Sequence, residues 1–187
     1  MGCQVSIDTE TNSIRTIAIV GLDGSGKSSI ANQMMTHDSS EKFIPIPTAA
    51  VDFQEQSLGA SVFRIYDCGG FGRYRSQWSY FINESDGVVF VIDRSDKNRM
   101  SCVREEIAEV ITQCKQLGIP LLILVNKTDI DSPLNIDDIS SITKVNGSGI
   151  DYTIKECSAQ TGEGIIPGRD WLLQHIKPKN VVSPMEQ

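Results

Sequence analysis

The sequence has no block of Lys and Arg residues, and its net charge is −7. An acidic chain without a basic patch lacks the electrostatic footprint of a nucleic-acid-binding protein, and charge does not draw it to anionic lipids. No apolar run is long enough to span a bilayer, and no secretory signal precedes the first strand. We therefore expect a cytoplasmic protein that binds no nucleic acid.

Cysteine and histidine are sparse, with five and two residues. No C-x-x-C pair and no His/Cys cluster is present, so the sequence offers neither a zinc-site pattern nor a disulfide framework. An odd number of scattered thiols is typical of proteins in a reducing compartment.

What is present fits one α/β domain: the chain has 187 residues, 40% hydrophobic and 22% charged. Apolar, β-rich runs predict six strands, at residues 14–20, 50–56, 61–67, 87–93, 120–126 and 152–157. Because helix-period segments separate most of them, we predict a mostly parallel sheet with helices on both faces. The second and third runs flank Leu58-Gly59 and predict an antiparallel edge hairpin.

Helices are predicted at residues 29–35, about 103–117 and 168–176. The middle helix is expected to bury one face, formed by Val103, Ile107, Val110, Ile111, Cys114 and Leu117. Residues 145–151 are expected to form a loop. We divide the chain into an N-terminal extension (1–13), one domain (14–177) and a flexible tail (178–187).

The segment GLDGSGKS at 21–28 satisfies G-x-x-x-x-G-K-[ST] and lies between a predicted strand and a predicted helix, as a phosphate-binding P-loop requires. Its glycines let the backbone amides wrap phosphates, Lys27 reaches the terminal phosphates, and Ser28 presents a hydroxyl to Mg²⁺. The predicted nucleotide contacts here are Gly21, Asp23, Gly24, Ser25, Gly26, Lys27, Ser28 and Ser29.

The segment NKTD at 126–129 predicts the base as guanine. The Asp129 carboxylate can accept hydrogen bonds from guanine N1–H and the exocyclic amine, a donor pair that adenine lacks. Asn126 is expected to tie this loop to nearby backbone, and the Lys127 stem to lie over the base. In CSAQTGEG at 157–164 we expect Ser158 to take part and the Ala159 amide to meet guanine O6.

At the N-terminus, MGCQVS matches M-G-x-x-x-[ST], which predicts myristoylation of Gly2. A palmitoylated Cys3 would supply the second signal that a stable anchor needs. We therefore expect peripheral membrane association through N-terminal acyl chains.

With these motifs, the chain resembles a small GTPase of the Ras superfamily, and within it the Arf/Arl family, over nearly its whole length. The likeness rests on GLDGSGKSS, on PT at 47–48, YDCGG at 66–70, Trp78, NKTD and GEGIIPGRDWLL at 162–173. The resemblance implies a P-loop NTPase G domain that binds GTP or GDP with Mg²⁺ and acts as a molecular switch.

The resemblance also implies roles for particular residues. Thr48 would coordinate Mg²⁺ and meet the γ-phosphate, Asp67 would hold Mg²⁺ through water, and the Gly70 amide would sense the γ-phosphate. The hairpin at about 49–66 would be the interswitch element. Residues 43–54 and 70–82 would bind an effector, an exchange factor or a GTPase-activating protein, and we expect a monomer.

Two positions depart from the family pattern. The first-switch string is PTAAVDF where P-T-I-G-F is usual, which alters the effector surface, and Phe71 replaces the glutamine that aligns the attacking water. We expect slow intrinsic GTP hydrolysis unless a GTPase-activating protein supplies the missing group. Arg73 and Arg75 are either solvated or partner contacts. They also match a run found in a cilium-associated Arl subgroup, so a nucleotide-locked scaffold or exchange factor for another Arl remains an alternative.

Overall fold

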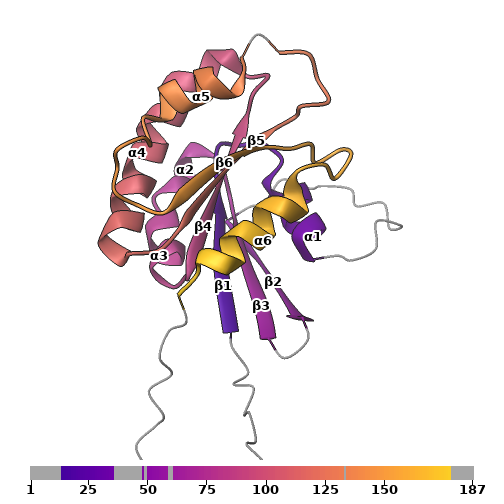
Figure 1. Cartoon of the computed structure of the whole chain (residues 1–187), viewed down its shortest axis with the longest axis vertical. Coiled ribbons are helices and arrows are strands. Elements are labelled where there is room, and N and C mark those ends of the chain that lie inside the picture. Colours follow the sequence, from indigo (N-terminus) through magenta and orange to yellow (C-terminus); the bar gives the residue numbers. More distant parts are fainter. Residues whose placement is uncertain (1–13, 36–47, 49, 59–60, 133, 178–187) are drawn as a thin grey trace, which may run out of the picture.

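The computed structural model describes residues 14–35, 48, 50–58, 61–132 and 134–177 (Figure 1). The extension with Gly2 and Cys3, and the predicted tail, lie outside the described residues. In chain order the elements are β1 (Ile14–Val20), α1 (Lys27–Met35), β2 (Val51–Leu58), β3 (Ser61–Cys68), α2 (Gly72–Arg75), α3 (Trp78–Asn83), β4 (Gly87–Asp93), the 3₁₀ helix η1 (Lys97–Arg99), α4 (Met100–Leu117), β5 (Leu121–Asn126), α5 (Ile136–Thr143), β6 (Tyr152–Glu156) and α6 (Ile165–His175).

The six strands form one sheet in the order β2-β3-β1-β4-β5-β6. The β2–β3 pair is antiparallel, with Val51 opposite Cys68, and the other neighbouring strands pair in parallel. The predicted fold class, a mostly parallel six-stranded sheet with one antiparallel edge hairpin, is confirmed.

Two layers of helices enclose the sheet: α3, α4 and α5 lie on one side, and α1 and α6 on the other (Figure 1). Successive residues of a strand point to opposite faces, so Ala18 and Val20 join the first core while Ile17 and Ile19 join the second. This two-sided burial explains why the central strands are continuous apolar runs in the sequence.

The helices match the predictions less closely than the strands do. The α5 helix was not predicted from the sequence, and neither were the short α2 and α3. The α6 helix begins at Ile165 rather than at residue 168, with Pro167 in its first turn, where the missing amide breaks no helical hydrogen bond. Leu117 was expected in the buried face of α4, but it lies at the end of the helix and is exposed.

None of the helices in the described part of the chain combines the length and the apolar composition that a bilayer crossing requires. The fold instead brings the carboxyl ends of the parallel strands to one edge, where the loops after β1, β3, β5 and β6 carry most of the predicted nucleotide contacts. Open parallel sheets bind their ligands at this edge.

Candidate nucleotide-binding site

The P-loop adopts a backbone conformation that only glycine accommodates at two points. Gly21 has φ of 141°, and an added Cβ there would lie 2.3 Å from the Val91 carbonyl oxygen. Gly26 has φ of 95°, and an added Cβ would lie 2.3 Å from Asn126 Nδ2. The loop therefore packs directly against β4 and the base-recognition segment, and it turns into α1 at Lys27.

Lys27 is buried, and its Nζ donates a hydrogen bond to the Leu22 carbonyl oxygen at 2.9 Å. Burial lowers the pKa of Lys27 to about 8, although the nearby Asp67 and Asp23 act in the opposite direction. The P-loop thus surrounds an ammonium group that has lost much of its hydration. An anion placed at the start of α1 would stabilise its charged form.

Ser28, Thr48 and Asp67 converge on one point, although they lie on α1, on the segment before β2 and on β3. The Ser28 hydroxyl donates to Asp67 Oδ2 at 2.5 Å, and the Thr48 hydroxyl donates to the same oxygen at 3.2 Å. The two hydroxyl oxygens are 3.1 Å apart. These are the residues predicted to hold Mg²⁺.

The chemistry of this set fits a divalent cation. Burial raises the pKa of Asp67, against the lowering effect of its hydrogen bond from Ser28. Its second oxygen, Oδ1, is buried and has no hydrogen-bond partner among the described residues. A hard cation with oxygen ligands would satisfy that oxygen and offset the cost of burying the charge.

Gly70 lies against the P-loop. An added Cβ at this position would be 2.4 Å from the Asp23 amide nitrogen and 2.6 Å from Lys27 Nζ. The preceding Gly69 is fixed on both sides, since its amide donates to the Ala50 carbonyl at 2.7 Å and its carbonyl accepts from Trp78 Nε1 at 2.9 Å. The loop after β3 therefore approaches the phosphate-binding segment through its backbone.

Asp23 is paired with two arginines that sequence reasoning did not connect to it. Arg99 Nη1 lies 3.0 Å, and Arg75 Nη2 3.5 Å, from Asp23 Oδ1. Arg75 also donates to the Gly70 carbonyl at 2.8 Å and pairs with Glu106 on α4 at 3.0 Å. The alternative that Arg75 is solvated is wrong, because its side chain is only 16% exposed and bonded within the molecule, whereas the alternative that it contacts a partner stays a prediction.

Arg73, in contrast, is exposed, and its guanidinium lies over the Tyr74 ring at 4.8 Å from the centroid. Phe71 stands at the N-cap position of α2, where it provides no side-chain cap, and it is 43% exposed. It directly follows Gly70, so the residue next to the glycine that lies against the P-loop has a side chain without hydrogen-bond donor or acceptor.

The residues predicted to recognise the base form a second cluster beside the P-loop. Asn126 Nδ2 donates to the Ser25 carbonyl at 2.7 Å, and Asn126 Oδ1 accepts from the Ala159 amide at 2.9 Å. Asn126 thus joins the P-loop to the loop after β6. The side chain of Ser158 donates to Asp129 and accepts from the amide of Thr161 at 3.2 Å.

Lys127 has a positive φ of 70°, and its Nζ lies 2.6 Å from Asp93 Oδ2, so its charged end is held by β4. Next to it is a cavity of about 200 Å³. Its lining includes Asp129 and Ser158, together with Thr128, Glu156, Thr161 and Glu163. The cavity is polar and lies at the end of β5, where the NKTD segment was predicted to receive a base.

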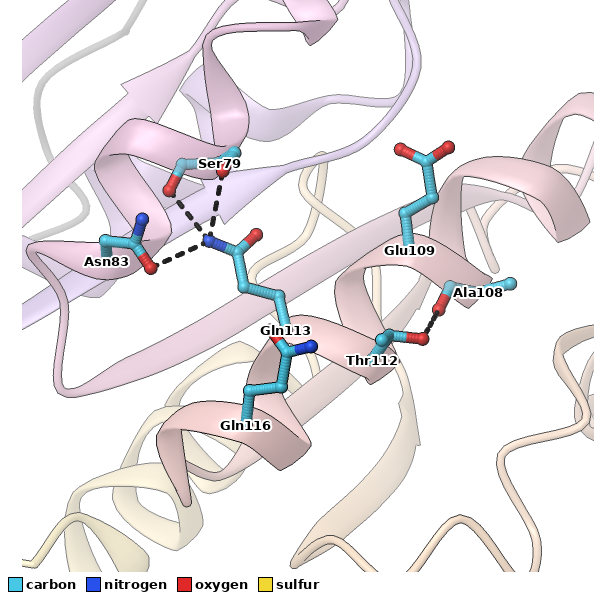
Figure 2. A pocket seen from close by; sticks show the side chains of 7 residues that line it. All are labelled: Ser79, Asn83, Ala108, Glu109, Thr112, Gln113 and Gln116. Atoms are coloured by element: carbon cyan, nitrogen blue, oxygen red, sulfur yellow. Dashed lines mark hydrogen bonds between the residues drawn. The ribbon is translucent and has the colours of Figure 1, made fainter.

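A larger surface hollow, of about 500 Å³, lies between α3 and α4, away from these residues. Figure 2 shows Gln113 reaching from α4 toward α3, where its Nε2 donates to the Ser79 carbonyl at 2.8 Å and to Asn83 Oδ1 at 3.1 Å. Gln113 therefore ties α3 to α4, and it contacts no predicted nucleotide residue.

The fold and the P-loop after its first strand define the chain as a P-loop GTPase of the Ras superfamily. The Arl6 BBS3 small GTPase from Trypanosoma brucei, with the bound nucleotide analogue GppNp, is similar in structure. The TM-score is 0.76 at 26% sequence identity, covering 87% of this chain and 96% of the other.

Two curated relatives are also similar in sequence. ADP-ribosylation factor-like protein 2 of Arabidopsis thaliana is 34% identical over 162 residues, 86% of either chain. ADP-ribosylation factor-like protein 6 of Danio rerio is 32% identical over 164 residues, 86% of this chain and 88% of the other. Residues 5–176 match the ADP-ribosylation factor family. The chain belongs to this family, and the predicted resemblance is confirmed.

Proposed function

We propose that the protein is a guanine-nucleotide switch in which Mg²⁺ and GTP order the loops around Thr48 and Gly70 for an effector. The observation that carries this proposal is the convergence of Ser28, Thr48 and Asp67 beside the P-loop lysine. When bound, Mg²⁺ would neutralise charge between the phosphates and Asp67. Ser28 and Thr48 would hold it with their hydroxyls, Lys27 would bind the phosphates, and Asp129 would select the base.

The proposal is tested with three labelled nucleotides, GDP, ADP and xanthosine diphosphate, and with three proteins, the wild type and two variants. Wild type should bind GDP and not ADP, and Lys27→Ala should lose GDP. Asp129→Asn replaces an acceptor pair by an amide that can donate to the 2-oxygen of xanthine, so it should favour xanthosine diphosphate over GDP. Equal affinity of wild type for ADP and GDP would reject the base assignment, and unchanged GDP affinity of Lys27→Ala would reject the P-loop assignment.

The effector surface is proposed to include a row of aromatic side chains. Phe53 on β2 contacts Tyr66 on β3, which contacts Phe81 on α3, with ring centroids 5.5 and 5.2 Å apart; Tyr80 follows at 5.2 Å. Phe53 is 50% and Tyr80 65% exposed, and exposed aromatic groups are typical anchors of interfaces. The row lies between the segment after Thr48 and the helix after Gly70, so both nucleotide-sensitive loops border it.

A pull-down with GTP-loaded and GDP-loaded protein tests this surface. Partners should be retained by the GTP form and lost with Tyr80→Ala, while Gln174→Ala on the exposed surface of α6 should retain them. Partners that bind both nucleotide forms equally would argue against a switch.

Membrane association is proposed to come from acylation of Gly2 and Cys3, on the strength of the N-terminal motif. Gly2→Ala should move the protein from the membrane fraction to the supernatant of lysed cells. Continued sedimentation of this variant with membranes would remove acylation from the proposal.

A further inference from the structure

We infer that Gln33, on α1, is a positioning residue for guanine recognition: it holds the Ala159 carbonyl and so keeps the loop after β6 beside Asn126, where the Ala159 N–H would be shared with guanine O6. This inference rests on the proposed function, since it concerns the same nucleotide site. Gln33 belongs to none of the predicted nucleotide motifs. It lies on α1, six positions after Lys27, and only the start of this helix was predicted to contact the phosphates.

The first observation is a hydrogen bond between distant parts of the chain. Gln33 Nε2 donates to the Ala159 carbonyl oxygen at 2.7 Å, across 126 residues of sequence. The bond is partly buried, and an added Cβ at Gly162 would lie 3.2 Å from Gln33 Oε1. The Gln33 side chain is thus packed between α1 and the loop that follows β6.

The second observation is that Ala159 is held from both sides. Its amide donates to Asn126 Oδ1 at 2.9 Å, and its carbonyl accepts from Gln33. These two groups belong to the peptide units on either side of the Ala159 α-carbon. The two hydrogen bonds therefore fix the position of the loop after β6. Because the Ala159 N–H is directed at Asn126 Oδ1, guanine O6 would share this donor with Asn126.

The third observation is that the supporting helix is itself held in place. Arg169 of α6 is buried and donates from Nη1 to the Met34 carbonyl at 2.9 Å, one residue after Gln33. A cation at the last carbonyls of α1 also matches the negative end of the helix dipole. Gln33 thus projects from a fixed support, which is what positioning requires.

The side-chain N–H of Gln33 is the group that positions Ala159, because it is the donor of the hydrogen bond to the Ala159 carbonyl. Without it, the Ala159 carbonyl loses its partner on α1, and the loop gains freedom that guanine must remove on binding. One hydrogen bond of this kind changes an equilibrium by about threefold to tenfold. Gln33→Met keeps the length of the side chain and removes the donor, whereas Gln33→Lys keeps a long side chain that ends in a donor.

The test measures the dissociation rate of labelled GDP from Mg²⁺-loaded protein. Gln33→Met should release GDP about threefold to tenfold faster than wild type, and Gln33→Lys should stay within about twofold of wild type. The matched control is Gln113→Met, which removes an amide that donates to a backbone carbonyl at 2.8 Å between α3 and α4, away from the nucleotide residues (Figure 2). It should release GDP at the wild-type rate.

A second readout separates positioning from a general loosening of the fold. The probe is 2-aminopurine riboside 5′-diphosphate, which has hydrogen in place of O6. It also lacks the N1 proton, but that loss is common to wild type and variant. Gln33→Met should weaken affinity for GDP and leave affinity for this analogue unchanged, because the analogue offers nothing to the Ala159 amide.

Three results would overturn the inference while leaving the proposed function intact: an unchanged GDP release rate in Gln33→Met, a loss of affinity for the analogue equal to that for GDP, or Gln33→Lys as fast as Gln33→Met. Failure of the proposed function looks different, because wild-type protein itself would then not distinguish GDP from ADP.

Discussion

At the scale of single residues, Asp67 and Phe71 differ in what their side chains can do, although they lie close together in the chain. Asp67 is buried, accepts from Ser28 and Thr48, and keeps one oxygen without a partner in the described part of the chain, which suits a cation. Phe71 lies four positions later and offers no polar group. The position predicted to bind the metal and the position at which the family has a water-orienting glutamine are therefore different residues, and only the second lacks a polar side chain.

We predict that Phe71→Gln accelerates single-turnover GTP hydrolysis by at least about tenfold, which corresponds to about 1.4 kcal/mol of activation free energy. The glutamine amide can orient the attacking water, and little packing is lost because Phe71 is 43% exposed. Phosphate release from preloaded protein measures the rate. Phe71→Leu is the control and should hydrolyse at the wild-type rate; a glutamine variant that is no faster would refute the prediction.

The buried thiols give a second prediction for single residues. Burial raises the pKa of Cys68, Cys114 and Cys157 to about 12 in each case. At about pH 8 almost none of each thiol is thiolate, so iodoacetamide should leave all three unmodified in the folded protein. Peptide mass spectrometry reads the modification, and half-buried Cys102 is the comparison. Rapid labelling of the three in folded protein would contradict their burial.

The same pKa shifts predict the direction in which the free energy of unfolding changes with pH. Because the pKa of each thiol is higher in the folded protein than the ordinary 9.0, the folded state retains these protons longer than the unfolded state. Their contribution to the free energy of unfolding is present below about pH 9 and is lost as pH rises toward 12.

At the scale of elements, the sequence predicted what depends on local pattern. The strands β4 and β5 are continuous apolar runs, apart from their polar last residues, because both faces are buried, and the P-loop has a fixed spacing of glycines. The contacts of Arg75 were not predictable in this way, because Glu106 is 31 residues away and a guanidinium in a short helix looks solvated in sequence. Gln33 was missed for the same reason, since its partner lies across 126 residues.

The α5 helix was missed although it carries a local signal. It is only eight residues long, too short for a clear hydrophobic period, but Asn135 accepts from the Asp138 amide at 2.9 Å while Asp138 accepts from the Asn135 amide at 3.0 Å. This capping box is written in the sequence as N-I-D-D. The start of this helix is therefore marked in the sequence by its cap and not by its hydrophobic period.

We predict that Asn135→Ala lowers the free energy of unfolding by about 1 kcal/mol, because the amide of Asp138 loses its acceptor. Urea denaturation in saturating GDP and Mg²⁺ measures the change with ligand held constant. Asn135→Ser retains an acceptor oxygen and should recover most of the stability. Equal stability of the alanine and wild-type proteins would show that the capping box contributes little here.

At the scale of the whole molecule, one sheet separates two hydrophobic cores, and the candidate site lies at one edge of this sheet, at the carboxyl ends of its parallel strands. The P-loop follows β1, Asp67 and Gly70 belong to β3 and its loop, and Asn126 ends β5. Cross-links such as Asn126 to Ser25 join these loops to one another. Because the loops come from separate strands, a ligand that contacts all of them bridges elements that separate on unfolding.

We therefore predict that stability is strongly linked to guanine nucleotide. With Mg²⁺ and GDP at about a thousand times Kd, the free energy of unfolding should rise by about 4 kcal/mol, whereas the same concentration of ADP should leave it unchanged. Differential scanning calorimetry over a series of nucleotide concentrations measures the effect as a rise in Tm. Lys27→Ala is the control, because it removes the ammonium group that the P-loop surrounds, and its Tm should not respond to GDP. An equal rise with ADP would mean that the loops recognise phosphates alone, and it would separate phosphate binding by the P-loop from base selection by Asp129.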